Sequence, residues 1–273
     1  MARLAKSVYG NSYRSTFPLS NETMREVAPS IFAGHADDEC SERYAFIPTI
    51  KVIEGLREQG FSPFFVAQTN CRTNDKMPFA RHMVRLRHHT TISAKEANEL
   101  ILLNSHDRTS GFQLLGGVFR DACQNAMVWG HESADFRIRH TGDSVVGHVI
   151  EGAFSILENF EKMDSSKDTM KAIELTNDEQ MSFARCALTL RYDEGESPIP
   201  ASQLLRLRRW EDRSNDLWTV FNRIQEALTK GGCAGVTKNS RRMTTRGVTS
   251  ITENVRLNKA LWALAEAMTV LKS

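Results

Sequence analysis

The pattern of hydrophobic and polar positions changes along the chain. In the N-terminal half, apolar residues form short runs separated by polar turns, most clearly over 61–69 and 79–88. Short runs bounded by turn residues are typical of β-strands, and two of them joined by a polar loop indicate a hairpin. Further strands are expected over 100–104 and 112–115, whereas 118–128 fits a helix or a helix followed by a strand.

Apolar residues recur at helical spacing elsewhere, above all after residue 144. Spacing of three and four residues places such residues on one helix face, and Pro48 and Gly60 suit the start and the end of a helix. Thr176 followed three residues later by Glu179 is a capping-box pattern. Helices are therefore expected over 47–60, 144–160, 176–192, 214–231 and 253–271, with a short helix beginning at Ser93 and a loop over 231–250.

This segregation of strands and helices predicts an α+β fold. We expect an antiparallel sheet in the N-terminal half packed with a mainly helical C-terminal half. Residues 1–42 are interpreted as an N-terminal arm with one short helix. Residues 43–273 are expected to form a single α+β domain, sheet-rich over 61–130 and helical over 144–273.

The charge balance limits how the protein can recognise a partner. Its 273 residues include 35 Lys and Arg against 33 Asp and Glu, a net charge of +2. Nucleic-acid binding through overall charge is therefore excluded, and local basic patches would be required. No apolar run approaches the roughly 18 residues that cross a membrane, and the N-terminus lacks the apolar core of a signal peptide. We expect a cytoplasmic protein with no membrane partner.

The first basic patch lies on the run over 79–88. Alternation along a strand places Arg81, Arg85 and Arg87 on one face, with no acidic residue between positions 75 and 96. Guanidinium groups bind phosphates through paired donors, so this face is a candidate nucleic-acid surface. The structural alternative is that these arginines pair with acids from a neighbouring element.

A second basic patch lies within 227–252, a stretch that contains no Asp or Glu. Glycine-rich basic loops can wrap a nucleic-acid backbone, although such loops are as often simply exposed. Just upstream, Trp210 has two possible roles, stacking on a base or burial in the core. The candidate nucleic-acid-binding residues of this stretch are Lys238, Arg241, Arg242 and Arg246.

The densest group of polar residues follows the predicted strand over 100–104. We expect His106, Asp107, Arg120 and Asn125 to lie close together around a polar site. Consecutive Ser, His and Asp residues do not form a catalytic triad, because a triad converges from separate segments. A simple polar turn is the structural alternative. The candidate polar-site residues are Asn104, Ser105, His106, Asp107, Arg120, Gln124 and Asn125.

Cysteine and histidine spacing gives no sign of a metal centre. The five cysteines are scattered without a Cys-x-x-Cys pair, and no His-Glu-x-x-His pattern occurs. We expect no metal and no cofactor.

Several motifs together resemble one family of proteins. It is the uncharacterised phage/plasmid-like protein family of bacterial prophages and conjugative plasmids, and the resemblance covers nearly the whole chain. The family has no established activity, and its setting favours DNA transactions or interference with host defence. The motifs that carry the resemblance are Ser41-Glu42-Arg43-Tyr44 with Ile47-Pro48-Thr49, Pro63-Phe64-Phe65, Leu103-Asn104-Ser105-His106-Asp107, Phe119-Arg120 with Cys123-Gln124-Asn125, Arg209-Trp210 with Ser214-Asn215-Asp216-Leu217-Trp218, and Asn258-Lys259-Ala260-Leu261-Trp262.

Two positions depart from the pattern that the family leads us to expect. Arg108 and Ala126 stand where glycine is expected, and either position could require a positive φ.

Three hypotheses of function follow from the sequence. The first is a non-enzymatic accessory protein of a mobile element that binds nucleic acid, with single-stranded DNA favoured, in the manner of phage single-strand annealing proteins. The second is an interaction protein that inhibits a host defence or repair enzyme. The third is a hydrolase or nuclease that uses His106 and Asp107.

Overall fold

The computed structural model describes residues 11–40, 44, 46–71, 73–92, 95–121, 125–130, 135–138 and 145–272. The chain divides into two compact units. The first unit comprises Met1–Val118 and Glu132–Phe160, and the second comprises Phe119–His131 and Glu161–Ser273. The assignment of residues 43–273 to a single α+β domain stays a prediction.

An antiparallel sheet dominates the N-terminal half, which confirms the predicted α+β fold. The predicted hairpin is present, with Phe61 opposite His88 and Gln68 opposite His82. The strand order is β1-β2-β3-β4-β5-β6, with β7 also paired to β5. The strands are β1 (Asn11–Arg14), β2 (Phe61–Gln68), β3 (His82–His88), β4 (Glu96–Asn104), β5 (Phe112–Arg120), β6 (Asn125–Val128) and β7 (Asp135–Ile138).

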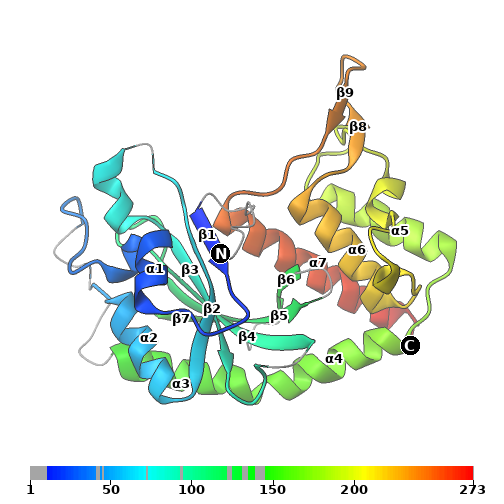
Figure 1. Cartoon of the computed structure of the whole chain (residues 1–273). Helices are drawn as coiled ribbons and strands as arrows, with labels where there is room; N and C mark the ends of the chain where they lie inside the picture. The colour runs from blue at the N-terminus through cyan, green and yellow to red at the C-terminus, as the bar shows by residue number, and fades with distance from the viewer. Residues whose placement is uncertain are drawn as a thin grey trace. The chain divides into compact units, whose positions relative to one another are not determined.

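Helices pack on the sheet within the first unit (Figure 1). The apolar positions Val52, Ile53 and Leu56 are spaced for one helix face, and all three are buried where α2 meets β2 and α3. Ser20 starts α1 by accepting a hydrogen bond from the backbone N–H of Thr23. The helices are α1 (Asn21–Val27), α2 (Thr49–Glu58) and α3 (Val145–Glu158), with 3₁₀ turns η1 (Pro29–Phe32) and η2 (Asn74–Phe79).

The second unit is built around α6, whose residues 217–229 are all buried. Trp218, Phe221 and Trp262 meet edge to face, with ring centroids 5.7 to 5.9 Å apart. The predicted capping box is confirmed, with the Thr176 and Glu179 side chains each accepting from the other residue's backbone N–H. The elements are α4 (Phe160–Ala172), α5 (Asn177–Thr189), η4 (Ala201–Leu205), η5 (Trp210–Asp212), α6 (Leu217–Lys230), β8 (Ala234–Val236), β9 (Arg242–Thr244) and α7 (Ile251–Lys272).

Several local predictions were wrong. Ser93, the expected start of a short helix, lies outside the described residues, and the chain forms β4 from Glu96 instead of continuing such a helix. The helical interpretation of 118–128 gives way to the end of β5 and to β6. In both places pairing in the sheet overrides local helix signals. The expected loop over 231–250 contains the β8–β9 hairpin, and the helix expected from residue 214 begins at Leu217, capped by Asp216.

Candidate nucleic-acid interface

The strand arginines are not a solvated surface, so the prediction of an open phosphate-binding face on β3 was wrong in its geometry. Arg85 is 1% exposed, and Arg87 is also buried. Both pair with the buried Glu99 of β4, at 2.6 Å from Arg85 Nε and 3.0 Å from Arg87 Nε. Arg14 of β1 lies 3.4 Å from the same carboxylate. The structural alternative, pairing with an acid from a neighbouring element, describes this face.

Glu99 stays charged despite its burial. Burial by itself raises the pKa of this carboxyl, but the charges of Arg85, Arg14 and Arg87 outweigh it and hold the pKa below its usual value. The third predicted arginine, Arg81, lies just before β3 and donates to the backbone carbonyl of Thr109. Through Glu99 the cluster links β4 to its neighbour β3 and to β1, which lies beyond β2 in the sheet.

The polar residues after β4 form a structured turn. Asn104 donates to Thr49 Oγ1 at 3.0 Å, and Ser105 Oγ accepts from the backbone N–H of Ser110 at 2.9 Å. Asp107 accepts from both the backbone N–H and the hydroxyl of Thr109. These contacts match the polar-turn alternative of the sequence analysis.

His106 lies inside the first unit with no exposed surface. Its ring packs between those of Phe46 and His82, with centroids 4.8 and 5.3 Å away. A general base must reach the proton it removes. This burial gives the hydrolase hypothesis no support.

His82 belongs to a buried polar network in the same unit. Its Nδ1 lies 2.8 Å from Ser30 Oγ and its Nε2 lies 2.9 Å from Thr49 Oγ1. Burial, with a smaller contribution from the charge of His106, lowers the pKa of His82 to about 3. The ring is therefore neutral at physiological pH. Ser30, Thr49 and His82 were not among the predicted site residues.

The convergence of His106, Asp107, Arg120 and Asn125 stays a prediction. His106 and Asp107 belong to the first unit, whereas Arg120 and Asn125 belong to the second. Asn125 begins β6, and Gln124 lies outside the described residues.

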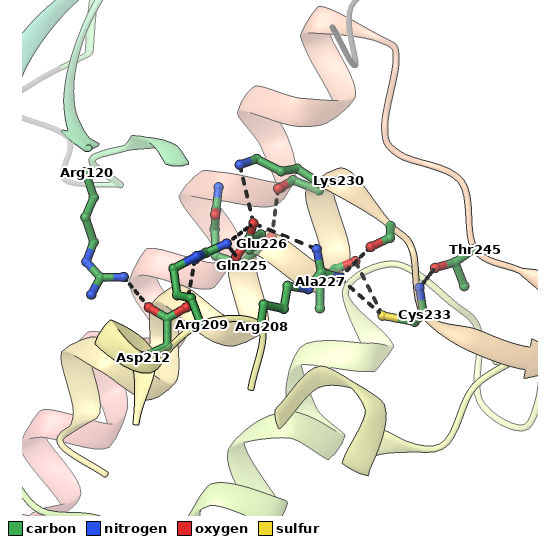
Figure 2. A network of polar contacts seen from close by, with 12 residues as sticks. Arg120, Arg208, Arg209, Asp212, Gln225, Glu226, Ala227, Lys230, Cys233 and Thr245 are labelled. Carbon is green, nitrogen blue, oxygen red and sulfur yellow. Dashed lines mark hydrogen bonds and ion pairs between the residues drawn. The ribbon is translucent and has the colours of Figure 1, made fainter. Parts of the chain in front are cut away.

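In the second unit Arg120 takes part in a chain of ion pairs, which Figure 2 shows. Its Nη1 lies 2.6 Å from the buried Asp212, whose other oxygen lies 2.7 Å from Arg209. Arg209 also donates to both oxygens of Glu226, at 2.8 and 2.9 Å. One guanidinium thus links η5 to α6.

Two further cationic side chains lie close to the Glu226 carboxylate near the end of α6. Lys230 and Arg208 lie 3.5 and 3.8 Å from its carboxylate. Burial alone raises the pKa of Glu226, but the hydrogen bonds from Arg209 and the charges of Lys230 and Arg208 outweigh it and leave the pKa below its usual value. Neither Asp212 nor Glu226 was among the predicted site residues. Glu226 lies within the apolar helical run that begins at Leu217, whereas Asp212 stands in a polar stretch that gives no such signal.

The predicted basic residues of 227–252 are exposed on and beside the β8–β9 hairpin. This hairpin projects from the second unit, in orange in Figure 1. We call this hairpin the basic hairpin, together with the exposed cationic side chains on and beside it, Lys238, Arg241, Arg242 and Arg246. Lys238 pairs with the exposed Glu196. Arg241 and Arg242 have no ion-pair partner within the part of the chain that the structure describes.

The base of the hairpin is firmly packed. Gly231, with φ of +71°, ends α6, and a Cβ atom there would meet the Thr245 carbonyl oxygen at 2.5 Å. At the other end of β8, next to the turn, Val236 donates its backbone N–H to the Pro198 carbonyl at 2.9 Å. The basic hairpin is therefore a defined two-stranded element, not a loose loop.

Trp210 lies at the start of η5 and is 74% exposed. Of its two predicted roles, core burial is wrong. The Arg213 guanidinium stacks on the ring, 3.8 Å from its centroid. The indole is thereby presented to solvent next to positive charge.

The described residues offer neither a membrane-spanning helix nor a cluster of metal ligands. None of the helices in the described ranges is long and apolar enough to cross a membrane. Among those same residues, His, Cys, Asp and Glu side chains form no group of three or more that could hold a metal ion.

Fold and surface together define an α+β protein with a projecting basic hairpin in its second unit. The chain belongs to the family described as Domain of unknown function (DUF932), whose family model matches residues 38–262. It is 44% identical over 270 residues to the UPF0380 protein YafZ of Escherichia coli (strain K12), covering 98% of each chain. The UPF0380 protein YfjQ of the same strain gives the same identity and coverage. No solved structure matches the chain.

These comparisons confirm the resemblance to an uncharacterised family. The two residues that depart from the expected family pattern, Arg108 and Ala126, differ in backbone conformation. Arg108 adopts a φ of +65°, the left-handed conformation that glycine favours. Ala126 lies within β6 and has no positive φ. The backbone conformation thus explains why glycine is expected at position 108, but it does not explain why glycine is expected at position 126.

Proposed function

We propose that this protein is a non-enzymatic accessory protein of a mobile genetic element, and that it binds nucleic acid through the basic hairpin. The observation that carries the proposal is the exposure of four cationic side chains on a projecting element whose stretch, 227–252, contains no acid. A binding surface for phosphates needs such a local excess of charge in a protein of net charge +2.

The arrangement of the hairpin supports contacts to a phosphate backbone. Arg241 and Arg242 follow the turn at its tip, where each guanidinium is exposed and offers paired donors. Contacts of this kind are independent of base sequence and weaken as salt rises. The resemblance of the sequence motifs to prophage and plasmid proteins supports the mobile-element setting.

The test is a binding panel with labelled single- and double-stranded DNA and RNA, measured by fluorescence anisotropy. The double variant Arg241→Gln/Arg242→Gln removes two hairpin charges. Its matched control, Lys51→Gln/Arg185→Gln, removes two charges from exposed positions on α2 and α5. If both hairpin arginines meet phosphates, binding of a single strand should fall about 25-fold at 0.1 M salt through lost counterion release.

The control variant should bind like the unaltered protein. Equal losses in both variants would show that the hairpin has no special role and would overturn the proposal. Absence of binding to all four nucleic acids would do the same. In that case inhibition of a host defence or repair enzyme becomes the hypothesis to test, with exposed Leu207 and Trp210 as its first contact candidates.

A further inference from the structure

Trp210 differs from the other tryptophans of this chain in its surroundings. Trp129, Trp218 and Trp262 are buried, whereas Trp210 is 74% exposed. Arg213 covers one face of its indole at 3.8 Å, and a ring with a second covered face would not retain that exposure. One broad face of the indole is therefore open to a flat partner.

The open ring is held in place by buried charge. Arg209, the residue before Trp210, is bound to Glu226 of α6, and Asp212, two residues after it, is bound to Arg120. Both carboxylates are buried. The exposed ring thus stands on a short 3₁₀ turn fastened on both sides, so little conformational entropy is lost when a ligand stacks on it.

The charge around the ring suits a polyanion. Arg206, Arg208 and Arg213 are exposed in this segment, against the one exposed acid of the same stretch, Glu211. Arg208 also donates to the Gly231 carbonyl at 2.6 Å, at the root of the basic hairpin. A nucleic-acid backbone that reaches the ring can therefore continue toward the hairpin within the same unit.

We infer that Trp210, backed by Arg213, is a stacking platform for an unpaired nucleobase, so that the ligand of this protein is single-stranded nucleic acid. The inference rests on the proposed function and names its substrate class. Aromatic rings hold single strands because every base presents a flat face once it is released from pairing. In a duplex those faces are covered by neighbouring base pairs, and the platform has nothing to bind.

Intrinsic fluorescence provides a direct readout, because Trp210 is the exposed member of the four tryptophans. Titration of the full-length protein with oligothymidylate should quench this emission. A mixed-sequence duplex and a strand of abasic sugar-phosphate units of equal length should leave it nearly unchanged, even where they bind the hairpin.

Variants then assign the signal and the affinity. Trp210→Ala should weaken binding of oligothymidylate by about 5- to 160-fold. Trp210→Phe, which keeps an aromatic ring, should retain most of the affinity of the unaltered protein. Leu207→Ala is the matched control, because Leu207 is an exposed apolar side chain of the same segment. It should bind like the unaltered protein.

The outcomes separate this inference from the proposal on which it rests. Binding that depends on the hairpin arginines but is indifferent to Trp210→Ala, without quenching, overturns the stacking platform and leaves the proposed function standing. Quenching by the duplex equal to that by the single strand also overturns it. Absence of any nucleic-acid binding would contradict both the stacking platform and the proposed function.

Discussion

Neutralising Glu99 is the sharpest test of how the first unit is held together. The carboxylate has no exposed surface and lies within 3.4 Å of three guanidinium groups on β1 and β3. Glu99→Gln keeps the shape of the side chain but removes the buried negative charge that faces Arg85 and Arg87. Both buried arginines then lose the attraction of this carboxylate.

The expected cost can be estimated from burial. Removing one partner of a buried pair costs about 3–5 kcal/mol, because the remaining charge cannot be solvated. Arg14 is 19% exposed in its side chain and stacks on Phe65, so Arg14→Gln should cost about 1 kcal/mol or less. Arg85→Gln should cost about as much as Glu99→Gln, since Arg85 is equally buried.

The assay is urea unfolding followed by far-ultraviolet circular dichroism. Hydrogen exchange of peptides from β2, β3 and β4 locates the loss in the first unit. Glu58→Gln, at an exposed position of α2, is the control and should change little. A loss below about 1 kcal/mol for Glu99→Gln would refute the reasoning, because it would mean that the arginines do not depend on this carboxylate.

Three further predictions concern single positions. Gly231→Ala should destabilise the second unit by several kcal/mol, because its Cβ meets Thr245, whereas Gly34→Ala, with open space, should cost under about 1 kcal/mol; thermal unfolding measures both. Arg108→Gly should be neutral or stabilise by up to about 1 kcal/mol relative to Arg108→Ala, because it relieves a positive φ; the reverse order in urea unfolding would count against that reading. The His82 ring should show no protonation between pH 8 and 4 by NMR, because its pKa is about 3. The free energy of unfolding should fall as the pH drops from 6.5 toward 3, since the unfolded state binds the proton more readily. An NMR titration midpoint near pH 6 would contradict this.

Glu99 adds a second source of pH dependence. Its pKa in the folded state lies below the ordinary value of 4.5, so the unfolded state takes up a proton first as the pH falls. The stabilisation is complete above pH 4.5 and is lost on further acidification through the folded pKa. Glu99→Gln should flatten this part of the stability curve.

Features that depend on a few neighbouring residues could be predicted from the sequence. The capping box from Thr176 to Glu179 and the helix that ends before Gly60 need only local spacing, and both are present. The hairpin of β2 and β3 follows from two apolar runs. For the basic stretch over 227–252, an exposed loop was one of the two interpretations that the sequence left open.

The features that were missed depend on long-range pairing. Glu99 reaches Arg85 and Arg87 only because β3 and β4 pair with Arg85 opposite Ile101. Because a helix was expected to begin at Ser93, this pairing of β3 with β4 was not predicted. The acid within an apolar run, Glu99 before Leu100, was the signal that could have revealed it. The exposure of Trp210 likewise depends on ion pairs with Glu226, which lies 16 positions further along the chain.

The salt dependence of binding tests the central claim most directly. The logarithm of the affinity for a single strand should fall linearly with the logarithm of salt concentration, and each phosphate contact contributes a slope of about 0.7. Arg241→Gln/Arg242→Gln should therefore lower the slope by about 1.4. Arg87→Gln, in the buried cluster, should reduce stability and leave the slope unchanged. An unchanged slope in the hairpin variant, or a slope lowered by Arg87→Gln, would contradict the assignment of binding to the basic hairpin.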